Sequence, residues 1–411
     1  MNSISDIIPK VASKAQQRFM TILFSTIIVM CGKVNFTNLS RYSEISERTY
    51  RRQFSRSYNF IKGNAEIISK AILPTSRQIV ATDCSFIKKS GKATYGIEYF
   101  YNGSAGKAEK GLEVSVIAVI DVDTKQGYAL SVQQTPPAQP ESERTRIDWY
   151  LEQLAATKPY LPKSVRHVVS DGFYSKIKWV DGVTALGLDA IGKLRCDADM
   201  RYVYTGKQKP RGRKRKYDGK VDLTDVSAMT LVSEIEPKLY IYTVEVWVVS
   251  MKRKVRLAYL RDCRNPERVG LALLFSTDIN LEVSAILCFY KSRFQIEFIF
   301  RDAKWSLSLA EVQFTGLSDC QARDLTKLDF HFNSSFTALN LAKLDAWQTH
   351  LSTHPNKSFV FSLASYKRLA LNRHLLDRFI SLLDLDLTSI KSHPNFHKLC
   401  SYGSISKQLC P

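Results

Sequence analysis

One short stretch, residues 290–304, carries polar groups at a spacing that could do phosphate chemistry. It reads Tyr-Lys-Ser-Arg-Phe-Gln-Ile-Glu-Phe-Ile-Phe-Arg-Asp-Ala-Lys. On a helix that turns by about 100° per residue, Tyr290, Glu297 and Lys304 fall within about 60° of Arg293. One carboxylate flanked by two cations suits the binding of a metal ion beside a phosphate. An ordinary i,i+4 Arg–Glu pair on a surface helix explains the same pattern equally well.

The apolar residues of this stretch lie away from the polar stripe. Phe294, Phe298 and Ile299 are therefore expected to belong to the core. Phe294 follows the stripe's arginine directly and could also stack on an unpaired base. The core interpretation is the simpler of the two for this aromatic ring.

Two further segments, each an extended run that ends in Asp, favour the chemical interpretation. Residues 79–83 read Ile-Val-Ala-Thr-Asp and end at Asp83, and residues 165–171 end at Asp171. An Asp at the end of a buried strand is held rigidly at the edge of the sheet. Two such carboxylates on neighbouring strands, together with a Glu from a helix, form the all-oxygen site that Mg²⁺ or Mn²⁺ prefers.

The whole pattern resembles the signature of a group of bacterial insertion-sequence transposases. In that signature Tyr, Arg, Glu and Lys are separated by two, three and six residues, and all four positions match here. These proteins are DDE transposases with a ribonuclease-H-like core, and the resemblance covers roughly residues 77–330. It implies that Asp83, Asp171 and Glu297 form the catalytic triad and bind two Mg²⁺ (or Mn²⁺) ions. It also implies that phosphates of the transposon end are gripped by Tyr290, Arg293 and Lys304.

The resemblance further implies a reaction and its partners. A transposase binds double-stranded DNA at terminal inverted repeats, cleaves the strands, and joins the 3′ ends to target DNA by two-metal phosphoryl transfer. By this analogy Asp83 bridges both ions. The analogy also implies a homodimer on paired DNA ends, with residues 331–411 as the region of dimerisation, and a bacterial cytoplasmic protein associated with the nucleoid.

Charge and cysteine content agree with a DNA-binding protein that stays inside the cell. The 411 residues carry a net charge of +20 and a pI near 9.5, which favours a polyanionic partner. No two of the eight cysteines are spaced as C-x-x-C, so neither a zinc ribbon nor a redox pair is indicated. The apolar run at residues 19–31 is too short to cross a bilayer, and no membrane association is expected.

Two basic segments are the candidate DNA contacts outside the core. Residues 1–75 are expected to be a helical DNA-binding region, in which a short turn and the helix at 47–54 outline a helix-turn-helix. The arginines on that helix are Arg48, Arg51 and Arg52. Residues 206–220 form a Gly/Pro-bearing run suited to contacts with the DNA backbone. Its expected contacts are Arg211, Arg213, Lys214, Arg215 and Lys216.

The predicted fold class is α/β. A ribonuclease-H-like catalytic core spans residues 76–330, with a β-rich insertion at 200–265 and helical regions at 1–75 and 331–411. Strands are expected at 78–83 and at 112–122, the second because it is rich in β-branched residues, and together with residues 94–103 they suggest the opening of an antiparallel meander. Apolar residues at helical spacing predict a helix at 147–154.

Three other functions remain open at this point. A ribonuclease-H-like nuclease or resolvase would share the triad but would hydrolyse DNA without strand transfer. A non-catalytic DNA-binding regulator would need no triad and would bind DNA equally well in chelator. An inactivated transposase would have decayed outside the triad and the signature, both of which are intact in this chain.

Overall fold

The structure is a computed structural model that describes residues 7–137, 141, 143–265, 267–304, 315–353 and 359–404. Its centre is a mixed sheet in which three antiparallel strands are followed by two parallel ones. The order β4-β3-β1-β5-β6 is that of a ribonuclease-H-like core, which confirms the predicted fold class. The strands are β1 (Gln78–Lys88), β2 (Glu98–Asn102), β3 (Lys107–Asp121), β4 (Gln126–Gln134), β5 (His167–Val169) and β6 (Asp189–Leu194).

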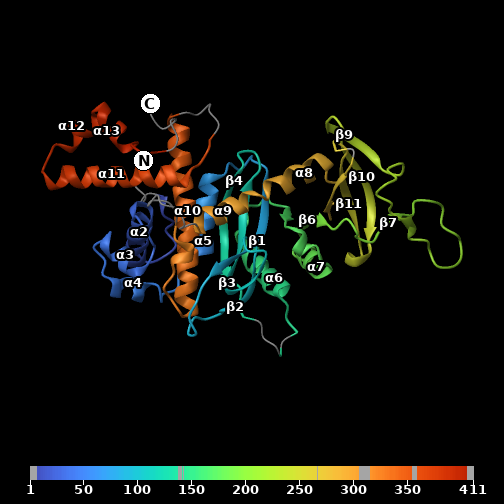
Figure 1. Cartoon of the computed structure of the whole chain (residues 1–411), viewed down its shortest axis with the longest axis horizontal. Coiled ribbons are helices and arrows are strands. Elements are labelled where there is room, and N and C mark those ends of the chain that lie inside the picture. Colours follow the sequence, from blue (N-terminus) through green and yellow to red (C-terminus); the bar gives the residue numbers. More distant parts are fainter. Residues whose placement is uncertain are drawn as a thin grey trace.

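Helices cover both faces of this sheet, as Figure 1 shows. Alternate residues of β1 face opposite sides: Val80 joins the core with Trp179 of α7, whereas Ile79 and Ala81 join the core with Ile299 of α9. The first face is covered by α6 (Arg146–Thr157) and α7 (Ile177–Ala185). The second is covered by α8 (Val283–Ser292), α9 (Gln295–Lys304) and α10 (Leu325–Thr353).

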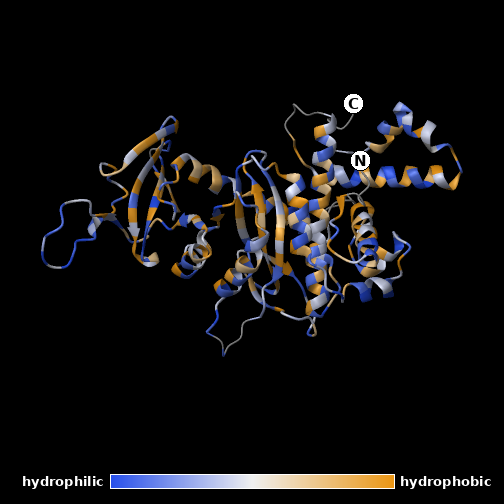
Figure 2. Cartoon of the chain, turned by 180° about the vertical axis from the view of Figure 1, so that it is seen from behind, coloured by the Kyte–Doolittle hydropathy of each residue, from blue (hydrophilic) through white to orange (hydrophobic). Residues whose placement is uncertain are grey.

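The β-rich segment continues the same sheet beyond β6, where β12 pairs with β6 and leads to β11 and β10. Figure 1 shows it as an extension to one side, ending in the long loop between β7 and β8. In Figure 2 this loop is hydrophilic throughout. The strands are β7 (Met200–Val203), β8 (Tyr217–Lys220), β9 (Thr230–Glu236), β10 (Leu239–Val248), β11 (Arg253–Asp262) and β12 (Gly270–Ser276).

The N-terminal helices pack on the other end of the core, against α10 and β4. They are α2 (Lys14–Val29), α3 (Phe36–Arg41), α4 (Glu47–Gln53) and α5 (Phe60–Ala71). The C-terminal helices are α11 (Leu363–Leu382), α12 (Leu387–Ser392) and α13 (Pro394–Cys400), and single 3-10 turns are η1 (Lys158–Tyr160), η2 (Gly172–Tyr174), η3 (Val249–Met251) and η4 (Leu317–Asp319). Within the described ranges, no helix combines the length and the apolar character needed to cross a membrane.

Local structure differs from the sequence prediction at three places. Strand β1 does not end at Asp83 but runs to Lys88, because β3 continues to pair with it after β5 has ended. Strand β4 was not predicted. The stretch 290–304 is not one helix, because α8 ends at Ser292 and α9 begins at Gln295. Tight turns of the i→i−3 kind at residues 294–297 join the two, so that each helix turns its own apolar side to the sheet.

The break also changes the environment of an aromatic residue. Phe294 lies in the turn between α8 and α9 and is 48% exposed, so its assignment to the core was wrong. Ile299 is buried as expected, and Phe298 is half-buried against Phe294 with ring centroids 5.1 Å apart. An aromatic ring beside Arg293 is therefore open to solvent.

Candidate active site

Two of the three predicted carboxylates are brought together by strand pairing. The parallel register pairs Ala81 of β1 with Val169 of β5, and two residues further along it leads to Asp83 and Asp171. Both side chains point to the face that α8 and α9 cover, because they share the alternation of Ala81 and Val169. Asp171 also caps η2 by accepting a hydrogen bond from the Phe173 N–H at 2.9 Å, which orients its carboxylate.

The third carboxylate is linked to the first by Arg293, the residue at the break between the helices. Its Nη2 donates a hydrogen bond to Glu297 Oε1 at 2.9 Å, and its Nη1 lies 3.6 Å from Asp83 Oδ2. The guanidinium side chain is only 13% exposed, and its Nε is buried without a hydrogen-bond partner in the part of the chain that is described. Arg293 thus connects strand β1 to helix α9 and keeps one donor unused.

The charges at this place influence one another strongly. Burial and the neighbouring Asp171 carboxylate raise the pKa of Asp83 to about 6, and the charge of Glu297 adds to that rise. The Arg293 guanidinium opposes this shift by favouring the ionised form. A carboxylate whose ionised form is disfavoured by two neighbouring carboxylates is a group that a bound cation would stabilise.

The remaining two signature residues lie at the same site. Burial lowers the pKa of Lys304 to about 8, against the attraction of the Asp83 charge. Burial also raises the pKa of the Tyr290 hydroxyl, whose ring is 5.7 Å from the Arg293 guanidinium carbon. The four side chains of the predicted stripe therefore lie at one site even though the helix that carries them is broken.

A glycine in β4 allows α9 to approach the sheet closely. A Cβ atom at Gly127 would lie 2.8 Å from Ile120 Cδ1 and 3.0 Å from Ile299 Cδ1, closer than such atoms normally come. The Gly127 carbonyl also accepts a hydrogen bond at 2.9 Å from the buried ammonium of Lys343 on α10. Since Ile299 lies two residues after Glu297, the missing side chain helps to set the depth of the third carboxylate.

The donor set fits a hard divalent cation. Asp83, Asp171 and Glu297 offer only oxygen ligands, which is the set that Mg²⁺ and Mn²⁺ prefer. Their ligand atoms are not all within 4.8 Å of one another, and Arg293 lies between Asp83 and Glu297. We call Asp83, Asp171, Glu297 and Arg293 the strand–helix cluster.

A second polar group lies on the same face, at the opposite end of β5. His167, Asp189 and Asp278 place their ligand atoms within 4.8 Å of one another, and His167 Nε2 is 3.5 Å from Asp278 Oδ2. We call them the three-strand cluster, because they lie at the ends of β5, β6 and β12. Asp171 lies four positions after His167, two residues beyond the end of β5, a distance of about 13 Å along extended chain. Sequence analysis missed this cluster, since its spacing matches no metal motif.

The basic residues proposed as DNA contacts lie away from both clusters. Arg48, Arg51 and Arg52 are exposed on α4, and Arg51 forms an ion pair with Glu47 at 2.6 Å. The five cations of the basic run are exposed in the loop between β7 and β8. Figure 1 shows α4 and this loop on opposite sides of the central sheet. The structure therefore does not join them into one surface.

Comparison with known proteins gives a family and little beyond it. No curated protein matches the chain. A crystal structure of endonuclease V from Bacillus subtilis is similar at 15% identity over 56% of this chain and 73% of that chain, with a TM-score of 0.25, which is too low to carry an argument. Residues 7–237, more than half of the sequence, match the family described as DDE superfamily endonuclease, a range that includes Asp83 and Asp171 but ends before Glu297. The chain belongs to the DDE superfamily endonuclease family.

Proposed function

We propose that the protein is a transposase that cleaves the ends of a DNA element and joins them to target DNA. Membership of the endonuclease family implies a DNA substrate and a divalent cation. The main support for a transposase is the position of Arg293. This residue contacts both Asp83 and Glu297, and its buried Nε has no hydrogen-bond partner among the described residues. A nuclease site made only of carboxylates would not need an arginine between them. A site that binds the phosphate at a DNA strand end would need one.

In this proposal Asp83, Asp171 and Glu297 are the catalytic carboxylates and hold two divalent ions. When bound, the ions activate a water or a 3′-hydroxyl as nucleophile and stabilise the leaving oxygen. Asp83 and Asp171 are fixed on adjacent strands, and Glu297 reaches the site from α9. The three side chains would thereby hold the ions between the sheet and the helix, where the ions would bind the reacting phosphate.

The signature residues would bind and orient the DNA end. The guanidinium of Arg293 and the ammonium of Lys304 supply positive charge near Asp83, and an arginine can contact two phosphate oxygens at once. The Tyr290 hydroxyl would donate a hydrogen bond to a phosphate oxygen. Phe294, which is exposed beside Arg293, is available to stack on an unpaired base at the end of the strand.

A hydrolytic endonuclease without strand transfer is the second candidate. The family match favours it, because the matched residues end at 237, before the Tyr290 to Lys304 stretch. The two functions share the carboxylates and the metal. They differ in whether the 3′-hydroxyl, once released, attacks a second DNA molecule.

The test is an incubation with a labelled fragment that carries the element end found in the DNA flanking the gene. Cleavage at the end in Mg²⁺, none in Ca²⁺, and joined products on added target DNA are expected. Glu297→Gln should abolish cleavage and leave DNA binding in Ca²⁺ unchanged. Glu66→Gln is the matched control, because Glu66 is also a half-exposed glutamate in an i,i+4 ion pair on a helix. Cleavage without joined products would favour the endonuclease, and full cleavage by Glu297→Gln would refute both.

A further inference from the structure

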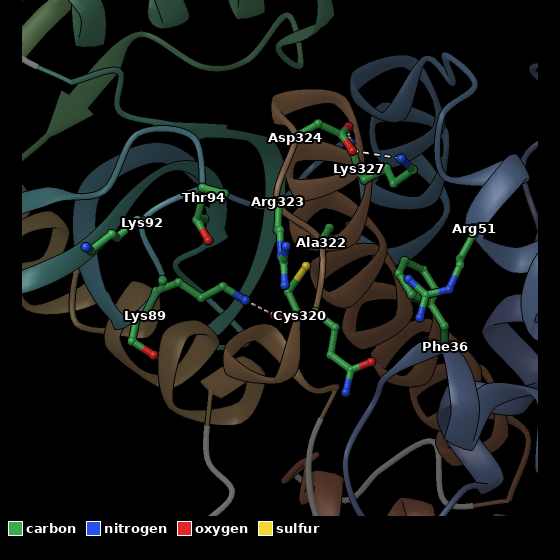
Figure 3. Close-up of a pocket in the computed structure, with 14 residues that line it drawn as sticks. Phe36, Arg51, Lys89, Lys92, Thr94, Cys320, Ala322, Arg323, Asp324 and Lys327 are labelled. Atoms are coloured by element: carbon green, nitrogen blue, oxygen red, sulfur yellow. Dashed lines mark hydrogen bonds and ion pairs between the residues drawn. The ribbon is translucent and has the colours of Figure 1, made fainter.

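A cationic pocket of about 890 Å³ lies between three segments that are far apart in the sequence. One wall is the connection from β1 to β2, with Lys89 and Lys92. The opposite wall is the N-terminal helical region, with Arg51. Figure 3 shows Arg323, from the segment that leads into α10, between these two walls. We call this hollow the three-wall pocket.

The three-wall pocket carries much more positive than negative charge. Five of its lining residues are cations, and Asp324 is its one carboxylate. Asp324 pairs with Lys327 at 2.7 Å, and Arg51 pairs with Glu47 outside the pocket. The three other cations have no carboxylate partner among the described residues; they are Lys89, whose ammonium donates to the Cys320 carbonyl, Lys92 and Arg323. Uncompensated cations from two separate segments, Lys89 and Lys92 on one and Arg323 on the other, suit a ligand that presents several negative charges.

Strand β1 connects this pocket directly to the strand–helix cluster. Lys89 follows the end of β1 and continues the alternation of Asp83 and Ile87, so it points to the same face of the sheet as Asp83. Lys89 lies six positions after Asp83 along extended chain, a distance of about 20 Å. Duplex DNA rises by about 3.4 Å per base pair, so this distance equals about six base pairs.

We propose that the three-wall pocket binds backbone phosphates of the DNA duplex about six base pairs from the phosphate that is cleaved at Asp83. The inference rests on the proposed function, because it takes Asp83 as the point of cleavage. A polyanion is the ligand that fits, since the cations come from separate walls and not from one anion-sized cradle. The contact is independent of base sequence, because lysines and arginines facing phosphates read charge only.

The first test measures how DNA binding depends on salt, in Ca²⁺ and with a mixed-sequence duplex of thirty base pairs as the probe. Each phosphate contact contributes about 0.9 to the slope of log K against log salt. Lys92→Gln with Arg323→Gln should therefore reduce the magnitude of the slope by about 1.8. Lys62→Gln with Lys398→Gln is the control for net charge, because both lysines are exposed and neither lines the pocket. An equal slope in the pocket and control variants would overturn the proposal.

The second test locates the contact by phosphate ethylation on the labelled element end. Ethylation about six base pairs from the cleavage point should block binding of the unaltered protein and have no effect on the pocket variant. Interference that is the same for both proteins would refute the pocket contact. The proposed function is tested separately by cleavage in Mg²⁺. A protein that cleaves and joins DNA but shows no pocket effect keeps its function and loses only this inference.

Discussion

The two polar clusters at opposite ends of β5 are built in different ways. The three-strand cluster takes all its residues from strand ends, and cross-strand register pairs His167 with Asp189 directly. The strand–helix cluster takes two carboxylates from the sheet and adds Glu297 from α9 and Arg293 from the turn before α9. The ligand atoms of the three-strand cluster are therefore close together. The strand–helix cluster instead combines carboxylates with a buried cation.

Close grouping of ligand atoms can also arise from strand register alone. Neighbouring strand ends bring side chains together as a consequence of register, and Asp189 is already satisfied by the Thr277 hydroxyl at 2.7 Å. In the strand–helix cluster, burial raises the pKa of Asp83 to about 6 and lowers the pKa of Lys304 to about 8. Perturbed groups beside one another are more typical of functional sites.

The sharpest separation of the two clusters comes from matched Asp→Asn substitutions. Asp83→Asn should lower the rate of single-turnover cleavage in Mg²⁺ by about 1000-fold, or about 4 kcal/mol, because one ligand of the reacting centre is lost. Asp189→Asn should change the rate by less than about threefold. Equal losses in the two variants would mean that the three-strand cluster takes part in the reaction.

The strand–helix cluster depends on how closely α9 packs against the sheet. Gly127→Ala should increase the distance between α9 and the sheet. The added methyl would press on Ile120 and Ile299, which should cost about 1–3 kcal/mol in the free energy of unfolding. We also expect cleavage to fall about tenfold, because Glu297 moves with α9. Urea unfolding and cleavage assays measure the two effects. Gly103→Ala is the control, since nothing lies within 4 Å of its added Cβ. If Gly127→Ala changed neither stability nor cleavage, Gly127 would not be needed to position α9.

Removal of the metal should affect one cluster and not the other. Mg²⁺ at ten times its Kd should stabilise the protein by about 1.4 kcal/mol, seen as a rise in Tm that EDTA reverses. Asp171→Asn should lose this rise, because it removes an oxygen ligand, and Asp189→Asn should keep it. If Mg²⁺ stabilised Asp171→Asn and failed to stabilise Asp189→Asn, the metal site would be the three-strand cluster and not the strand–helix cluster.

The smallest expected effect is the pH dependence of DNA binding through Lys304. Burial holds its pKa at about 8, so the ammonium is charged below that pH and loses its charge as the pH rises through 8. Affinity for an element end in Ca²⁺ should therefore fall several-fold between pH 7 and pH 9.5. Lys304→Arg should not show the decline, because a guanidinium stays charged over this range. Parallel curves for both proteins would exclude Lys304 as the titrating contact.

Sequence predicted the composition of the site better than its architecture. Asp83 and Asp171 were identified as the ends of extended runs and residues 290, 293, 297 and 304 from their spacing, and the structure brings all six to one site. The expected continuous helix failed at residues 293–294, since helical periodicity cannot show where two helices turn to bury separate apolar sides. Strand β1 extended past Asp83 because pairing with β3 continues there, which is a property of the partner strand.

By itself the sequence determined the strand-forming runs, the excess of positive charge and the identity of the groups that could bind a cation and a phosphate. Tertiary structure decided which of these groups meet. Parallel pairing of β1 with β5 sets Asp83 beside Asp171, and the turn before α9 brings Arg293 between Asp83 and Glu297. The three-wall pocket and the three-strand cluster likewise join residues from distant parts of the chain. Local patterns cannot encode such contacts, because they depend on the register and packing of elements that are separated in the sequence.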